Sequence, residues 1–122
     1  MISGWKKKYS DILKEFKYNE KRDIESAIIL DSILKKSKIN EKISSLIKDK
    51  SVFVIGSGPS LSTAIPKLKK LKKSVKIAAD SSVKPLVENG IIPDIVITDL
   101  DGDEKTLEKI SKKSIFVIHA HG

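Results

Sequence analysis

The sequence predicts an α/β fold: a three-layer sandwich with a Rossmann-like parallel sheet, preceded by amphipathic helices. From residue 51 onward, short β-branched runs alternate with amphipathic stretches. This alternation is typical of parallel strands that are covered on both faces and joined by helices. Before residue 51, apolar residues recur at the helical spacing of three and four. The change predicts an N-terminal helical segment, residues 1–50, and an α/β domain, residues 51–122.

The individual elements follow from the same patterns. Helical spacing over residues 9–16, 24–34 and 39–47 predicts two or three N-terminal helices. Apolar runs predict strands at 52–55, 75–79, 94–98 and 114–120. Between them we expect helices from 60 or 62 to about 72, with Pro66 near the first turn, from 81 or 82 to 89, and from about 103 to 112. Strand–helix–strand alternation implies right-handed crossovers between the strands.

Composition excludes several classes of protein. The chain has 122 residues, no cysteine and a net charge of +8, so neither a disulfide framework nor a thiolate metal site is available. No apolar run suits a signal peptide or a membrane span, and we expect a cytoplasmic protein with no membrane partner. Its lysines are interleaved with acids, and aromatic residues make up 5%. Lysines on solvated helix faces explain this pattern better than a nucleic-acid partner does.

Each predicted strand ends in residues that can do chemistry. The four ends are Gly56-Ser57-Gly58-Pro59-Ser60, Asp80-Ser81-Ser82, Thr98-Asp99-Leu100-Asp101-Gly102-Asp103 and His119-Ala120-His121-Gly122. Ligands of open parallel sheets bind beyond the carboxyl ends of the strands. The four ends therefore predict one rim around a crevice, and Ser81, Thr98, Asp103, His119 and His121 are expected among its lining residues.

The first strand end predicts a loop that binds nucleotide phosphates. Gly56, Ser57, Gly58 and Ser60 would line the phosphates, because glycines let backbone N–H groups approach an anion and a helix N-terminus adds positive charge. Leu61 replaces the third glycine of a dinucleotide fingerprint, and the Gly-Lys-Ser/Thr ending of a P-loop is absent. The alternative is a plain strand-to-helix turn with a serine cap.

The acids after the third strand predict a cation site. Asp99 and Asp101 are two residues apart, so an extended segment would point both the same way. Together with Asp80 from the neighbouring strand they would repel one another unless a cation lay between them. Mg²⁺ suits such a site, because it uses one or two carboxylates and keeps waters for substrate phosphates. The alternative is helix capping by Asp99 and Asp103, which accounts for only one or two of the acids.

His119 and His121 flank Ala120 at the fourth strand end. Two histidines could contribute to a zinc site, but no third protein ligand is evident from the sequence. We favour hydrogen bonding of these histidines to the backbone or to substrate.

In this order, GSGPSL, AADSS, PDIVITDLDGD and HAHG resemble the archaeal 6-hydroxymethyl-7,8-dihydropterin pyrophosphokinase family, which is similar in its nucleotide domain to thiamine pyrophosphokinases. The N-terminal helix with Trp5, Tyr9 and Phe16 is also similar to the opening of that family. The resemblance covers nearly all of the chain. That family continues past HAHG, so the chain resembles the N-terminal part of a longer protein. Residues 51–122 then resemble a nucleotide-binding domain truncated at its C-terminal side.

The resemblance implies a diphosphokinase, or pyrophosphokinase, that acts in the biosynthesis of tetrahydromethanopterin. ATP would give its diphosphoryl group to the hydroxymethyl oxygen of 6-hydroxymethyl-7,8-dihydropterin and release AMP. Asp99 and Asp101 would be catalytic, one of them as the base, and Mg²⁺ would be held by Asp80, Asp99 and Asp101. The pterin contacts are expected beyond Gly122, so the 122 residues alone are compatible with an inactive form. A homodimer stays open.

Three alternatives to this function remain. A haloacid-dehalogenase-like phosphatase would use Asp99 and Asp101, since its motif resembles strand-DLDG, although Asp103 stands where that family usually has threonine. A non-catalytic basic module would bind nucleotides or nucleic acid through its lysines, although the acidic rim would repel a phosphate backbone. A nicotinamide-cofactor domain is disfavoured by the missing third glycine.

Overall fold

The computed structural model describes residues 3–34 and 39–120. Contacts divide the chain into two compact units. The helices α1 and α2 belong to the first, and the second contains every element from α3 to β4. This division falls before α3, whereas the change of sequence character falls after it. The predicted domain boundary between residues 50 and 51 was drawn at the change of sequence character, and it stays a prediction.

The first unit consists of α1 (Trp5–Phe16) and α2 (Glu20–Ile33). α1 ends at Lys17, which has a left-handed φ of 56°, and the Tyr18 N–H then donates to the Leu13 carbonyl at 2.9 Å. Asn19 caps α2, because its side chain accepts a hydrogen bond from the Lys21 N–H. Neither helix buries a residue. The predicted N-terminal helices are confirmed, with α3 (Ile39–Ile47) as the third.

The second unit is built on a parallel sheet of four strands, β1 (Val52–Ile55), β2 (Val75–Ala79), β3 (Ile95–Thr98) and β4 (Ile115–Ile118). The strands lie side by side in chain order. The connecting helices are α4 (Leu61–Lys70), α5 (Val83–Glu88), which follows the 3₁₀ turn η1 (Asp80–Ser82), and α6 (Glu104–Ile110). Each predicted strand is present to within two residues at either end.

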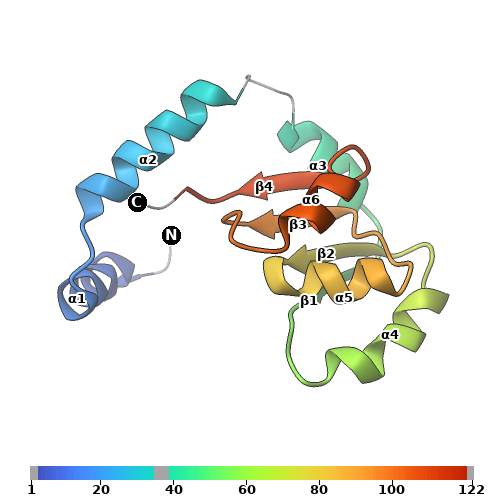
Figure 1. Cartoon of the computed structure of the whole chain (residues 1–122). Helices are drawn as coiled ribbons and strands as arrows, with labels where there is room; N and C mark the ends of the chain where they lie inside the picture. Colours follow the sequence, from blue (N-terminus) through green and yellow to red (C-terminus); the bar gives the residue numbers. More distant parts are fainter. Residues whose placement is uncertain (1–2, 35–38, 121–122) are drawn as a thin grey trace. The chain divides into compact units, whose positions relative to one another are not determined.

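The sheet has helices on both faces. Right-handed crossovers that all advance in the same direction place α4, α5 and α6 on one face, and α3 lies on the other (Figure 1). The predicted three-layer α/β fold with a parallel sheet is therefore confirmed. The order β1-β2-β3-β4 never reverses. Within these four described strands it contains no switch point of the kind that makes the crevice of a dinucleotide-binding sheet, and the candidate site is therefore sought in the loops after the strands.

The core lies between the sheet and helices α4 to α6. Ile55, Ala78 and Val96 are in register across three neighbouring strands and are buried. Leu86 from α5 and Ile110 from α6 are also buried, with at most 1% of their surface exposed. Burial of each large aliphatic side chain stabilises the fold by roughly 1.5–3 kcal/mol. This packing fixes the carboxyl ends of the strands relative to one another.

One helix differs from its prediction. α4 begins at Leu61 with Ser60 in the cap position, so Pro66 lies inside the helix rather than near its first turn. Its missing N–H leaves one backbone bond of the helix unmade. Ser60 occupies the predicted N-cap position of α4, but its hydroxyl makes no capping hydrogen bond. In the described part of the chain, no helix is both long enough and apolar enough to cross a membrane.

Candidate metal centre

Three of the predicted rim segments meet at the carboxyl edge of the sheet. Ile55 pairs with Ala78 and Ala79 with Ile97, so β1, β2 and β3 end beside one another. The chain leaves these strands through Gly56, Asp80 and Asp99. The predicted convergence of strand ends is therefore observed for the glycine loop, the Asp80 turn and the acidic loop.

Asp80, Asp99 and Asp101 come together at this edge. One carboxylate oxygen from each lies within 4.8 Å of the others. Three oxygens at this spacing can share a single cation, and carboxylates are the ligands that hard ions such as Mg²⁺ and Ca²⁺ prefer. In the described residues, the structure holds no other group of three histidine, cysteine or acidic side chains this close together.

The Asp80 carboxylate is the member of this cluster that calls for an explanation. Both of its oxygens are shielded from solvent, and with the neighbouring acids ionised neither has a hydrogen-bond partner among the described residues. A shielded polar atom without a partner loses its hydration and gains nothing in exchange, which costs about 1–3 kcal/mol or more. A bound cation would supply the positive charge that this carboxylate lacks. The residues present therefore fit a divalent metal.

The protonation of Asp101 reflects the same crowding. Its pKa is raised from the ordinary value, first by Asp99 and then by Asp80, because the carboxylates of both can accept a hydrogen bond from Asp101 only while Asp101 is protonated. Ionised carboxylates have no donor, so a proton held by Asp101 partly relieves the repulsion. A cation at this position would replace that proton and favour the ionised form.

Asp99 and Asp101 converge for a reason other than the predicted one. The segment is not extended, because Leu100 has a left-handed φ of 70°. The Leu100 N–H donates to the Thr98 hydroxyl at 2.8 Å, and Thr98 is itself buried. A turn anchored on the last residue of β3 therefore brings the two acids together. Leucine rarely adopts this backbone conformation, so the sequence contained no signal for the turn.

Asp103 has a structural role at this rim. Its carboxylate accepts hydrogen bonds from the N–H and hydroxyl of Thr106, which makes it the N-cap of α6. It also pairs with Lys84 at 3.0 Å. These contacts lower the pKa of Asp103 to about 2, with the Thr106 hydrogen bond as the largest cause and the Lys84 hydrogen bond next. The capping alternative thus holds for Asp103, whereas Asp99 belongs to the acidic cluster.

The glycine loop lies next to the Asp80 turn. Gly56 and Gly58 have open space where a side chain would stand, and Ser57 and Ser60 are exposed. The Ser81 hydroxyl donates to the Ser57 hydroxyl at 2.7 Å and so connects the two segments. This geometry leaves room for a ligand against the backbone of the loop, and phosphate binding there stays a prediction.

Sequence reasoning gave no functional weight to Ser82 and did not consider Lys84. Ser82 is fully buried, and its hydroxyl contacts the carbonyls of Ile55 at 2.9 Å and Ala79 at 2.6 Å. It therefore links the ends of β1 and β2 directly beneath the rim. The position of Ser82 after a predicted strand could have indicated a role at the rim, but the same position also suits the cap of the following helix. Pairing of Lys84 with Asp103 is set by tertiary packing.

His119 is the one predicted rim histidine that the structure describes. The backbone N–H of His119 donates to the Thr98 carbonyl at 2.9 Å, and its side chain is exposed. His119 is not a member of the group of side chains spaced for a metal. His121 lies outside the described residues. The prediction that both histidines lie at the rim is not tested further.

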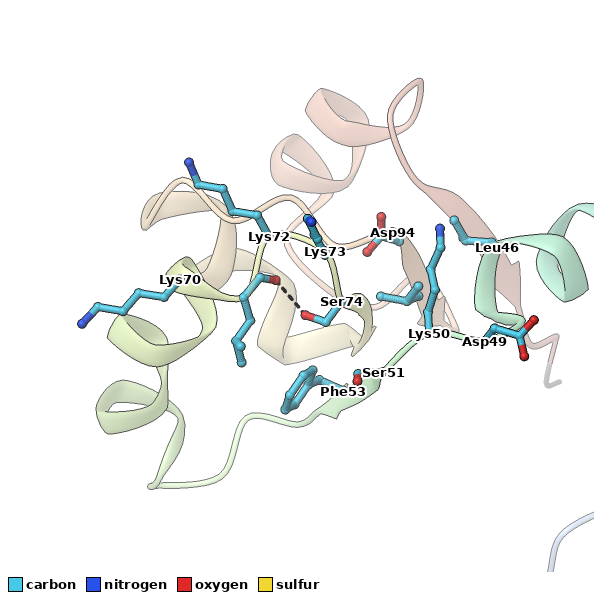
Figure 2. A pocket seen from close by; sticks show the side chains of 12 residues that line it. Leu46, Asp49, Lys50, Ser51, Phe53, Lys70, Lys72, Lys73, Ser74 and Asp94 are labelled. Atoms are coloured by element: carbon cyan, nitrogen blue, oxygen red, sulfur yellow. Dashed lines mark hydrogen bonds between the residues drawn. The ribbon is translucent and has the colours of Figure 1, made fainter.

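A cavity lies at the opposite edge of the sheet. Its volume is about 950 Å³, and Ser51, Ser74 and Asp94, which precede β1, β2 and β3, are in its wall. Figure 2 shows the lysines that line it, Lys50, Lys70, Lys72 and Lys73. Lysines near the C-terminus of α4 complement its dipole. A structural explanation therefore suffices for several of them, and the acidic cluster remains the stronger candidate site.

Comparison with known proteins identifies the family. The family model described as 6-hydroxymethylpterin diphosphokinase MptE-like matches residues 25–122. The chain belongs to this family. The match includes every described element from α3 onward, and therefore the acidic cluster and the glycine loop.

Three similar proteins carry the name 6-hydroxymethyl-7,8-dihydropterin pyrophosphokinase. The protein from Methanocaldococcus jannaschii is 39% identical over 99% of this chain and 53% of its own length. That from Pyrococcus furiosus is 42% identical over 97% of this chain and 52% of its own. That from Methanothermobacter thermautotrophicus is 32% identical over 99% and 53%. The chain therefore spans about half the length of the curated relatives it matches.

Proposed function

We propose that this chain provides the metal centre and nucleotide loop of a 6-hydroxymethyl-7,8-dihydropterin pyrophosphokinase. The enzyme transfers diphosphate from ATP to the hydroxymethyl group of the pterin and releases AMP. The activity rests on the names of the relatives, about half of whose length the chain spans. ATP, Mg²⁺, a cytoplasmic location and any homodimer are part of this proposal.

The observation that carries the proposal is the acidic cluster around Asp80. Two shielded carboxylate oxygens without partners lie beside two further carboxylates, in a chain with a net charge of +8. Exposed acids alone would be ordinary on a protein surface. The shielding of the Asp80 oxygens supports a ligand with positive charge.

Asp80, Asp99 and Asp101 would hold Mg²⁺, which when bound neutralises charge on the ATP phosphates. The Gly56–Ser60 loop would bind those phosphates through its backbone N–H groups, assisted by the N-terminus of α4. In the transfer, the pterin hydroxymethyl oxygen forms a bond to the β-phosphorus while the bond from that phosphorus to the α,β-bridging oxygen breaks. AMP leaves with this oxygen. The hydroxyl proton passes to Asp99 or Asp101 as the base.

Cation binding tests the site on this chain directly. Mn²⁺ can be titrated into the 122-residue protein and the free ion followed by electron paramagnetic resonance. We expect one site that Asp101→Asn weakens at least tenfold, since that variant removes a charged ligand. Asp49→Asn is the matched control, because Asp49 lies at the opposite edge and has a left-handed φ of 58° that asparagine tolerates. Equal Mn²⁺ affinity for all three proteins would overturn the metal centre.

A chimera tests the reaction. In it, this chain replaces the matched half of the Methanocaldococcus jannaschii relative. With ATP, Mg²⁺ and 6-hydroxymethyl-7,8-dihydropterin, we expect AMP and pterin diphosphate in equal amounts, and no product from the Asp101→Asn chimera. Formation of ADP or free phosphate would contradict diphosphoryl transfer, and free phosphate would favour the phosphatase alternative. A folded chimera without product, beside an active relative, would also count against the proposal.

A further inference from the structure

Gly102 lies against the carboxylate of Asp80. A Cβ atom at position 102 would meet Asp80 Oδ1 far inside contact distance and would lie 3.2 Å from Asp80 Cγ. On its other side, the same Cβ would lie 3.7 Å from Leu107 Cδ1, an ordinary van der Waals contact. The hydrogen atoms of glycine are therefore what allows the acidic loop to lie this close to Asp80.

Backbone conformation does not explain this glycine. Among the described residues, positive φ angles at glycine occur only at Gly4 and Gly90. At Gly56 and Gly58 an added Cβ would meet nothing within 4 Å. Gly102 thus differs from the other described glycines, since its restriction is steric and comes from one functional group.

We infer that Gly102 is a positioning residue for the metal centre: its missing side chain lets the Asp80 carboxylate stay turned toward Asp99 and Asp101. The inference rests on the proposed cation site and goes beyond it by assigning a residue that supplies no ligand. Its role is to set the spacing of ligands that belong to other residues.

The Asp80 carboxylate has little freedom to avoid a methyl group. Both oxygens are shielded from solvent, and Asp80 begins the 3₁₀ turn whose last residue, Ser82, is hydrogen-bonded to the ends of β1 and β2. Leu107, on the other side of Gly102, is buried in the core. A methyl group at position 102 must therefore rotate the carboxylate or lift the acidic loop. Either change separates oxygens that now lie within 4.8 Å of one another.

A double-mutant cycle read out by Mn²⁺ affinity tests this inference. The proteins are the unaltered 122-residue chain, Gly102→Ala, Asp80→Ala and the double variant. Residues that position metal ligands typically change affinity by about 10–100-fold, and we expect Gly102→Ala to weaken Mn²⁺ binding at least tenfold. In the Asp80→Ala background the same change should have almost no effect, because the carboxylate that the methyl group meets is gone.

Gly90→Ala is the control for losing a glycine. Position 90 has a φ of 76° and open surroundings, so alanine there should lower the melting temperature and leave Mn²⁺ affinity unchanged. If Gly102→Ala fails to fold, Asp80→Ala/Gly102→Ala should recover cooperative unfolding. Absence of that recovery would overturn the inference.

The outcomes separate the two proposals. If the unaltered chain binds Mn²⁺ and Gly102→Ala binds it equally well, the inference about Gly102 is wrong and the metal centre stands. An equal loss of affinity in both Asp80 backgrounds would also overturn it, because the effect would not pass through Asp80. If the unaltered chain shows no site, the metal centre is wrong and the role of Gly102 is wrong with it.

Discussion

The hydroxyl of Ser81 donates a hydrogen bond to the hydroxyl of Ser57 across 2.7 Å. This contact joins the glycine loop after β1 to the turn that carries Asp80 after β2. The predicted phosphate loop and the predicted metal centre are thereby held together by a pair of exposed side chains.

Ser81→Ala should loosen the glycine loop with little loss of global stability. The variant removes the donor, and one exposed hydrogen bond contributes about 0.5–1.5 kcal/mol at most. Hydrogen exchange at the amides of Ser57, Gly58 and Ser60 should accelerate, while the free energy of unfolding changes little. Ser111→Ala removes a comparable hydroxyl that bonds within the end of α6, and should leave loop exchange unchanged. Identical exchange in both variants would contradict the role of Ser81.

Asp101→Asn should raise the melting temperature of the cation-free protein. The pKa of Asp101 is raised, chiefly through its hydrogen bond with Asp99, so ionised Asp101 disfavours the fold at neutral pH and a neutral amide relieves the repulsion. Scanning calorimetry in EDTA and then in Mg²⁺ checks this. The unaltered chain should gain stability from Mg²⁺, whereas Asp101→Asn should respond weakly. A lower melting temperature for the variant in EDTA would argue against repulsion.

Asp103→Asn should be less stable than the unaltered chain only where Asp103 is ionised. The folded pKa of Asp103 is about 2, below its ordinary value of 3.8, so its ionised form favours folding. The benefit is complete above pH 3.8 and is lost as the pH falls through 2. Asparagine can still cap α6, which isolates the charge. In EDTA, the melting temperatures of the variant and the unaltered chain should differ at pH 6 and converge toward pH 2. A difference that stays constant with pH would contradict the stabilising role of ionised Asp103.

Leu86→Ala should destabilise the second unit by about 2–5 kcal/mol, because it leaves a cavity in a close-packed core. Leu86 is fully buried. Val54→Ala is the matched control from the opposite face of the sheet, where Val54 is 78% exposed, and it should change the free energy of unfolding by about 0.5 kcal/mol or less. Urea denaturation measures both changes. Equal effects of the two substitutions would mean that the core does not lie where the structure places it.

Much of the α/β frame could be predicted from local pattern. Runs such as 52–55 and 75–79 have the β-branched composition of buried strands, and both match the observed strands. Asp103 and Gly90 mark the start of α6 and the end of α5 through capping chemistry that involves only near neighbours. Pro66 shows the limit of such patterns, because Ser60 and Ser62 both suited a helix start and only the structure places the start after Ser60.

The site was partly predictable for a similar reason. Parallel strands joined by crossovers end at one edge, so Asp80, Asp99 and Asp101 could be placed together from their positions alone. The turn at Leu100 and the pairing of Lys84 with Asp103 could not be predicted, because both depend on contacts between segments rather than on local preference. The same dependence hid Ser82, whose partners lie at two strand ends.

By itself, the sequence determined the succession of helices and strands, the parallel direction of the sheet and the meeting of Asp80, Asp99 and Asp101 at its carboxyl edge. Those features follow from periodicity and capping, which act over a few residues, and from the right-handed crossover that joins neighbouring parallel strands. Only the tertiary structure decided the strand order, the separation of Asp103 from the acidic cluster and the contact of Gly102 with Asp80. These depend on close packing between distant segments, in which a single added methyl group would meet the Asp80 carboxylate.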